Sequence, residues 1–301
     1  MTQHKWVRSS LRHVATRLKQ EGQGICPGTV GRLLRKHHYT LKVNVKREVG
    51  GQHPDRNRQF EYLATQKEAF LAANQPVISV DTKKKELVGN FKNAGATWCL
   101  SAERVNIHDF PQDALGRAVP YGIYDVAHNR GTVAVGQSAD TPAFAVSALV
   151  CWWEREGQAL YPKATRLLVL CDAGGSNGCR PRAWKHHLQE QLSDRFGLEV
   201  TVCHYPTGCS KWNPIEYRLF SPMSGNWAGI PLRTFETVLA CIRGTTTRTG
   251  LTVSAFLQEG VYALGQKVSN AVMQSLNLHP HAVCPRWNYT FKPRPAMTQA
   301  R

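Results

Sequence analysis

Apolar runs and amphipathic segments follow one another from residue 76 onward in an order that restricts the possible folds. The pattern predicts three strands, a helix, a strand, a helix, a strand and a helix, at residues 77–81, 119–127, 132–137, 141–156, 166–171, 181–196, 198–204 and from 214 onward. The tripeptide Asn129-Arg130-Gly131 is a hairpin signal between the second and third strands. This order predicts an α/β domain with a mixed sheet.

Three acidic residues stand where these predicted elements meet loops. Asp81 closes the first strand, Asp172 directly follows the strand at 166–171, and Glu216 lies in the first turn of the helix that begins at Pro214. If folding brings the three carboxylates together, they repel one another, and a divalent cation with oxygen ligands relieves that repulsion. The sequence therefore predicts a magnesium site that acts on phosphodiester bonds.

Each of these positions also has a local explanation that needs no catalysis. An aspartate at a strand end commonly bonds to the following turn, which would account for Asp81. Asn213, Pro214 and Glu216 fit the N-cap, first and third positions of a helix with a capping box. The glycine-rich loop 173–178 after Asp172 could cradle a phosphate, which leaves a nucleotide-binding α/β enzyme as an alternative.

Other acids fit the site less well. Asp125 lies within a predicted strand and is the best substitute for one of the three. Glu190 and Asp194 belong to an amphipathic helix, and we expect both to be solvated.

The charge balance of the 301 residues points to a polyanionic partner. The chain has 38 Lys and Arg against 21 Asp and Glu, a net charge of +17. Residues 1–50 alone hold eleven basic and two acidic residues, a net charge of +9. This excess favours nucleic acid, although a basic solvated surface is the alternative.

Two short helices are predicted within these first fifty residues, on either side of a turn at 21–24. Their apolar positions are Leu11, Val14, Ala15 and Leu18 in the first helix and Val30, Leu33 and Leu34 in the second. The other face of the second helix carries the residues predicted to contact DNA, Thr29, Arg32, Arg35 and Lys36. The arrangement indicates a helix-turn-helix, or alternatively a plain helical hairpin with a solvated face.

Further DNA contacts are expected near the carboxylates. Lys83 and Lys84 follow Asp81, and Lys211 and Trp212 precede Glu216. Lysines can bind backbone phosphates, and a tryptophan can stack on a base or, alternatively, pack in the core.

The chain is expected to divide into a helix-turn-helix segment at 1–50, a linker helix at 51–75, the catalytic domain at 76–293 and a disordered tail at 294–301. Its start is too basic for a signal peptide, and its longest apolar run, 144–153, is far shorter than a membrane span. The nine scattered cysteines suit reduced thiols. These features predict a cytoplasmic, nucleoid-associated protein.

Several motifs resemble one known family. They lie at 79–86, 89–93, 108–111, 120–125, 174–178, 210–216, 245–251 and 287–290. Together they resemble the Rhodopirellula-type DDE transposases, which are bacterial insertion-sequence enzymes with a ribonuclease H-like catalytic domain. The predicted order of strands and helices is also that of the ribonuclease H-like fold, in which the first strand, the fourth strand and the last helix carry the metal-binding carboxylates.

The resemblance implies a mechanism for Asp81, Asp172 and Glu216. They would hold a pair of Mg²⁺ ions, with Mn²⁺ as a substitute, and Asp81 would bridge both ions. The enzyme would hydrolyse a phosphodiester at the element end and transfer the 3′ hydroxyl into target DNA. The implied partners are double-stranded DNA, as transposon ends and target, and further copies of the chain on that DNA, with no membrane and no small-molecule cofactor.

Two departures from the family pattern leave alternatives open. Cys26 stands before Pro27 where the family prefers serine, which would remove an N-cap bond. The family also carries a further N-terminal DNA-binding segment, so Met1 is expected to mark either a truncated copy or a wrongly chosen start. The competing functions are a ribonuclease H-like nuclease without joining activity and an inactive DNA-binding remnant.

Overall fold

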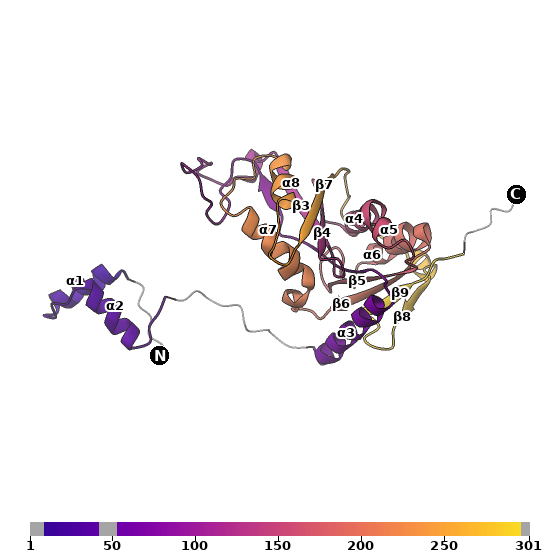
Figure 1. Cartoon of the computed structure of the whole chain (residues 1–301), viewed down its shortest axis with the longest axis horizontal. Coiled ribbons are helices and arrows are strands. Elements are labelled where there is room, and N and C mark those ends of the chain that lie inside the picture. Colours follow the sequence, from indigo (N-terminus) through magenta and orange to yellow (C-terminus); the bar gives the residue numbers. More distant parts are fainter. Residues whose placement is uncertain (1–8, 42–52, 296–301) are drawn as a thin grey trace. The chain divides into compact units, whose positions relative to one another are not determined.

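The computed structural model describes residues 9–41 and 53–295, which belong to two compact units (Figure 1). The first unit lies within residues 1–49 and the second within residues 50–301.

The first unit consists of α1 (Leu11–Gln20) and α2 (Pro27–Lys36), as the apolar spacing predicts. Ser10 caps α1, because its hydroxyl accepts the N–H of His13 at 3.1 Å. Cys26 precedes α2 and makes no side-chain capping bond, which agrees with the loss expected at this position. Ala15 and Val30 are buried, but Leu11 and Leu33 remain 39% and 40% exposed, so the prediction that these two leucines pack inside the unit was wrong. Two ten-residue helices are too few to enclose every apolar position.

The second unit is built on one mixed sheet. Within the described residues the strand order is β7-β4-β3-β1-β5-β6-β9-β8, and β2 pairs with β3. The strands are β1 (Val77–Thr82), β2 (Glu86–Val88), β3 (Gly116–Asp125), β4 (Arg130–Gly136), β5 (Arg166–Asp172), β6 (Glu199–Tyr205), β7 (Thr252–Gln258), β8 (Leu278–Pro280) and β9 (Asn288–Phe291). In the centre, β4, β3 and β1 are antiparallel neighbours, whereas β1, β5 and β6 run parallel. This confirms the predicted α/β domain with a ribonuclease H-like order of elements.

The helices of this unit are α3 (Arg56–Ala72), α4 (Pro142–Trp152), α5 (Gln158–Leu160), α6 (Arg182–His187), α7 (Ser221–Asn226), α8 (Phe235–Arg243) and α9 (Asn270–Gln274). Wider π-helical turns follow α4 and α6, at η2 (Trp153–Gly157) and η3 (Leu188–Asp194), and one precedes α7, at η5 (Glu216–Phe220). Short 3₁₀ turns lie at η1 (Pro111–Asp113) and η4 (Ser210–Trp212). The helix predicted to end at Gly157 continues to Leu160. A Cβ on Gly157 would collide with the Trp153 ring, so this glycine provides room for the ring rather than ending the helix.

Alternate residues of β1 enter different cores because the sheet is covered on both faces (Figure 1). Ile78 and Val80 pack in the core that contains Phe144 of α4. Val77 packs on the other face, in the core that contains Leu63 of α3. With both faces covered, the strand ends form the exposed edge at which Asp81 and Asp172 lie.

The helix predicted as a linker packs against this sheet. Gln59 of α3 is fully buried, and its side-chain amide donates to the carbonyl of His204 at 2.9 Å and to Asn288 Oδ1 at 2.7 Å. Leu63 and Phe70 are buried with it. Residues 56–72 are therefore a structural part of the second unit.

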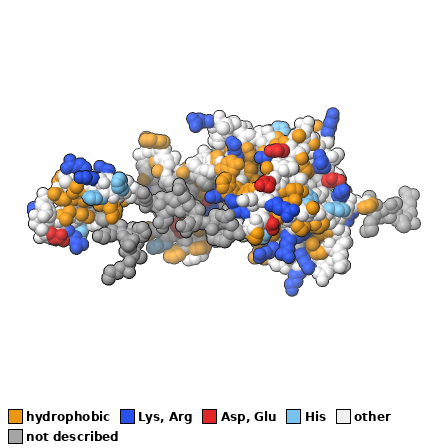
Figure 2. All heavy atoms as spheres, turned by 90° about the horizontal axis from the view of Figure 1, so that it is seen from below, with side chains coloured by type: hydrophobic (Ala, Val, Ile, Leu, Met, Phe, Trp, Pro, Cys, Tyr) orange, Lys and Arg blue, Asp and Glu red, His pale blue; other side chains and the backbone are white. Residues whose placement is uncertain are grey.

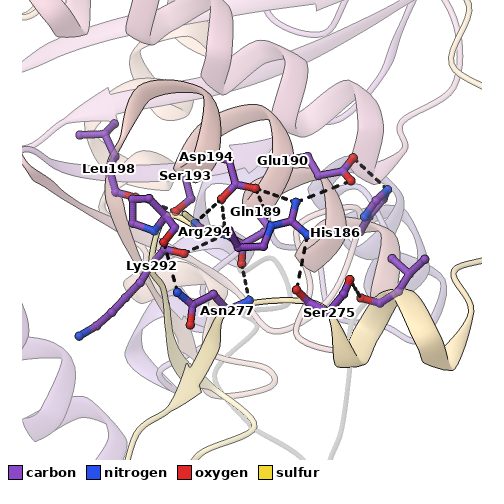
Figure 3. A network of polar contacts seen from close by, with 12 residues as sticks. His186, Gln189, Glu190, Ser193, Asp194, Leu198, Ser275, Asn277, Lys292 and Arg294 are labelled. Atoms are coloured by element: carbon purple, nitrogen blue, oxygen red, sulfur yellow. Dashed lines mark hydrogen bonds and ion pairs between the residues drawn. The ribbon is translucent and has the colours of Figure 1, made fainter. Parts of the chain in front are cut away.

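A polar network fixes the C-terminal segment to η3 (Figure 3). Arg294 Nη2 lies 2.7 Å from Asp194 Oδ2, and its backbone N–H donates to Asp194 Oδ1 at 2.8 Å. Gln189 donates to the carbonyl of Lys292 at 2.9 Å. The expectation that Asp194 is solvated was wrong, because its partner lies 100 residues further along the chain. Arg294 is ordered by these bonds, and the rest of the predicted tail, 296–301, lies outside the described residues.

None of the helices in residues 9–41 and 53–295 combines the length and the apolar character needed to cross a membrane.

Candidate active site

Strand pairing places Asp81 beside Asp172. β1 and β5 are parallel neighbours, and Val80 lies opposite Cys171. The next residue of each strand is therefore an aspartate, and both leave the sheet at its carboxyl edge. Asp81 Oδ1 also accepts the N–H of Thr82 at 2.8 Å, so the local turn bond expected for a strand-end aspartate is present as well.

The start of the helix that carries Glu216 is fixed to the same edge by buried hydrogen bonds. The hydroxyl of Ser79 accepts the N–H of Ile215 at 3.0 Å and donates to Asn213 Oδ1 at 2.5 Å. Asn213 Nδ2 in turn donates to Asp172 Oδ1 at 3.1 Å. Ser79 and Asn213 are both fully buried. A single chain of bonds thus ties β1, the helix start and Asp172 together.

The capping box predicted for Asn213 and Glu216 was wrong. The side chain of Asn213 bonds to Asp172 and to the carbonyl of Val80, and its backbone N–H donates to Ser210. The helix receives its side-chain cap from Ser79, on a different element. Within the described residues Glu216 makes no side-chain hydrogen bond, so its carboxylate remains available for another role.

The three carboxyl groups influence one another. Burial raises the pKa of Asp81 to about 8, and the nearby charge of Asp172, followed by those of Glu216 and Asp140, adds to this increase. Burial also raises the pKa of Asp172 to about 6; the hydrogen bond from Asn213 opposes the rise and the charge of Glu216 reinforces it. Burial raises the pKa of Glu216, whereas the ammonium of Lys83 lowers it. Such a cluster retains protons near neutral pH unless a cation compensates for its charge.

These carboxylates have the donor chemistry of a magnesium site, since hard cations prefer oxygen ligands. Within residues 9–41 and 53–295, however, no group of three or more His, Cys, Asp or Glu side chains is close enough to hold a metal ion as it stands. Asp81 and Asp172 project from adjacent parallel strands, and the charges of Asp172 and Glu216 both raise the pKa of Asp81, so the three carboxylates lie near one another without forming a ready-made ligand set.

The basic residues predicted to contact DNA on this unit lie around the same edge. Lys83 is half-buried with its Nζ 4.9 Å from the centre of the Trp227 ring, and burial lowers its pKa. Lys84 is exposed and lines a hollow of about 400 Å³ together with Lys83. Lys211 Nζ lies 5.2 Å from the centre of the Trp212 ring, and Trp212 is 50% exposed. Trp212 therefore has a free surface that a base could contact.

On the first unit, the predicted DNA-contacting residues lie on α2. Arg32, Arg35 and Lys36 are exposed, while the hydroxyl of Thr29 lies 3.3 Å from the sulfur of Cys26. DNA contact by these four residues remains a prediction.

The prediction that Asp125 could substitute for one of the three carboxylates was wrong. It lies opposite Ile78, toward the other end of β1 from Asp81. Its Oδ1 accepts the N–H groups of Ala127 and His128 at 3.0 and 3.1 Å, and the Tyr161 hydroxyl donates to it at 2.9 Å. Asp125 therefore stabilises the turn between β3 and β4.

Sequence reasoning missed Asp140, Ser79 and the positioning role of Asn213. Asp140 accepts a bond from the Thr82 hydroxyl at 3.1 Å and raises the pKa of Asp81. It lies in a loop between β4 and α4, where the sequence has no periodic signal. For Ser79 a signal existed: a serine inside an apolar strand, two residues before an aspartate, shares that aspartate's face.

We expect Ser79→Ala to destabilise the protein by about 2 kcal/mol, because it leaves the Ile215 N–H and Asn213 Oδ1 buried without partners. Urea unfolding followed by circular dichroism measures this, with the exposed Ser101→Ala as the control. A change below about 0.5 kcal/mol, the usual range for surface substitutions, would show that the helix start does not depend on this bond.

Comparisons with known proteins relate the chain as a whole to other sequences and structures. The sequence model of the family described as "Rhodopirellula transposase DDE domain" matches residues 1–293. A search of curated proteins finds no match. The solved structure "Mos1 transposase paired-end complex with left transposon end" is similar with 15% identity and a TM-score of 0.45, over 79% of this chain and 71% of that chain. For "Crystal structure of the mariner Mos1 paired end complex with Mg" the values are 16% and 0.47, over 79% and 72%.

Proposed function

The chain belongs to the Rhodopirellula transposase DDE domain family, and on that premise we propose that it hydrolyses a phosphodiester at the ends of a DNA element and joins the freed 3′ hydroxyl to target DNA. The observation that carries this proposal is the pairing of Asp81 and Asp172 on adjacent parallel strands, with Glu216 at the same edge. A local turn bond explains Asp81 alone, but it does not explain why the three carboxylates share one edge.

The three carboxylates would hold a pair of divalent cations, Mg²⁺ or Mn²⁺. Bound there, the cations would supply an activated water and stabilise the charge on the attacking and leaving oxygens. Asn213 keeps Asp172 in place through its bond to Oδ1, and the strand fixes Asp81. Glu216 lies on a π-helical turn, a local irregularity that often occurs at functional sites.

The proposed partner is double-stranded DNA. The net charge of +17 favours a polyanion, and Figure 2 shows Lys and Arg side chains spread over one face of the second unit, interspersed with several acidic ones. Lys83, Lys84, Lys211 and Trp212 would contact the strand at the site, and the exposed basic residues of α2 would contact the duplex.

The test uses the full chain with DNA that carries the sequences flanking its gene. In Mg²⁺ we expect cleavage at those ends, and joined products when pre-cut ends with free 3′ hydroxyls are supplied with a target plasmid. Cleavage without joined products would contradict transposition and favour a ribonuclease H-like nuclease. Binding with neither reaction would favour an inactive DNA-binding remnant.

A further inference from the structure

A pocket of about 1070 Å³ begins at the residue that follows Asp172. Ala173, Gly174 and Gly175 form part of its wall, and the segment 284–287 and the residues before α3 supply more of it. The proposed metal-binding carboxylates do not line it. A DNA strand held at Asp172 would therefore pass close to this pocket.

The pocket is cationic. Arg180, Lys185 and Arg286 line it, whereas Asp55 is the one carboxylate among its lining residues. In the part of the chain that the structure describes, none of the three cations has a carboxylate within 4.0 Å, and Asp55 is 3.7 Å from His53. Burial lowers the pKa of Lys185 because it disfavours the charged ammonium group. An anion bound beside Lys185 would offset this cost of burying the charge. These charges favour a ligand with more than one negative group.

The loop after Asp172 allows close approach of such a ligand. A Cβ on Gly174 would meet nothing within 4 Å, and Gly175 has a φ of +77°, so this part of the wall is open backbone without side chains. A phosphate can approach backbone N–H groups closely at such a surface. Pro285 and Trp287 add apolar wall, and the rings of Trp287 and His53 lie 4.7 Å apart.

The size of the pocket excludes a duplex. Its volume is close to the upper end of pockets that enclose small ligands. A duplex, whose major groove alone is about 12 Å wide, would lie across the rim. Cations combined with an aromatic side chain such as Trp287 are typical of sites for unpaired nucleic acid.

We propose that this pocket binds unpaired nucleotides of the DNA strand that passes Asp172, with their phosphates at Arg180, Lys185 and Arg286. The proposal rests on the proposed DNA-processing function and assigns part of its substrate to a defined place. It implies that the strands separate beside the cleaved bond, so that single-stranded DNA enters the pocket while the duplex remains outside.

The test compares two fluorescent probes with the full chain in EDTA, where no cleavage occurs. One probe is a blunt duplex of about 20 base pairs. The other is the same duplex with a fork of about five unpaired thymidines on each strand at one end, a length within the number of nucleotides that a single-strand site contacts. We expect the forked probe to bind at least about fivefold more tightly. Arg180→Ala and Arg286→Ala, both changes of exposed side chains, are expected to remove this advantage while binding of the blunt duplex stays within about twofold.

Arg182→Ala is the matched control, because Arg182 is an exposed arginine nearby that does not line the pocket. It is expected to retain the preference for the forked probe. Equal binding of both probes by the unchanged chain, or equal weakening of both probes by the pocket variants, would overturn the proposal. A pocket-dependent preference without Mg²⁺-dependent cleavage would instead uphold the pocket and contradict the proposed function.

Discussion

Replacing Asp172 with asparagine is expected to lower Mg²⁺-dependent DNA cleavage by at least about 10³-fold. Asparagine keeps the shape of the side chain and can still accept the bond from Asn213 Nδ2, so the fold should persist. The variant loses a charge that would hold the cations. Metal ions lower the activation free energy of such reactions by several kcal/mol, and each change of about 1.4 kcal/mol alters the rate tenfold. Single-turnover cleavage of end DNA measures the loss.

Asp140→Asn is the informative control for this prediction. Asp140 raises the pKa of Asp81 and accepts a bond from Thr82, but it lies outside the proposed ligand set. We expect it to lose less than about tenfold in rate, since it would act only through its neighbours. If Asp172→Asn kept more than a tenth of the activity, or if Asp140→Asn lost as much as Asp172→Asn, the assignment of the three carboxylates would be wrong.

Asp81→Asn is expected to stabilise the protein at pH 8 in the absence of divalent cations while it abolishes cleavage. In the folded protein the pKa of Asp81 is raised from 3.8 to about 8, so between these values the folded state binds more protons than the unfolded state. The contribution of the Asp81 carboxyl group to the free energy of unfolding is therefore fully present below about pH 4 and is lost as the pH rises toward 8. Asparagine carries no charge and avoids that loss.

The expected increase in Tm at pH 8 is at least about 5 °C, because several pKa units correspond to several kcal/mol and a protein of this size gains about 2–4 °C per kcal/mol. Calorimetry in EDTA at pH 5 and pH 8 measures it, with the exposed Asp109→Asn as the control. At pH 5, only about one unit above the unfolded pKa of 3.8, the increase in Tm should be much smaller than at pH 8. A lower Tm of Asp81→Asn at both pH values would indicate that the carboxylate stabilises the metal-free fold, contrary to this account.

The central part of the fold could be predicted because its signals are local. The apolar runs of β1 and β5 each end in an aspartate, and the helix start at Pro214 is set by proline chemistry. The outer strands β7, β8 and β9 were not predicted. β8 and β9 have only three and four residues, and β7, with seven, is only partly buried, so neither alternation nor a continuous apolar run identifies them.

The residues of the candidate site could be predicted from the sequence, but the hydrogen bonds and strand register that connect them could not. Asn213 looks like an N-cap in sequence because caps are local, yet its partners Ser79 and Asp172 are 134 and 41 residues away. Likewise, the mutual effect of Asp81 and Asp172 depends on the register between two strands. The pocket beside Asp172 also depends on residues near 53 and 286, which no local pattern connects.

The central claim is that Asp81, Asp172 and Glu216 act together on divalent cations, and Mn²⁺ binding tests it most directly. Electron paramagnetic resonance can count the ions bound by the full chain with pre-cut end DNA at pH 8. We predict two Mn²⁺ ions per chain, a loss of at least one in each of Asp81→Asn, Asp172→Asn and Glu216→Gln, and no loss in Asp109→Asn. Unchanged binding in the three carboxylate variants would contradict the claim.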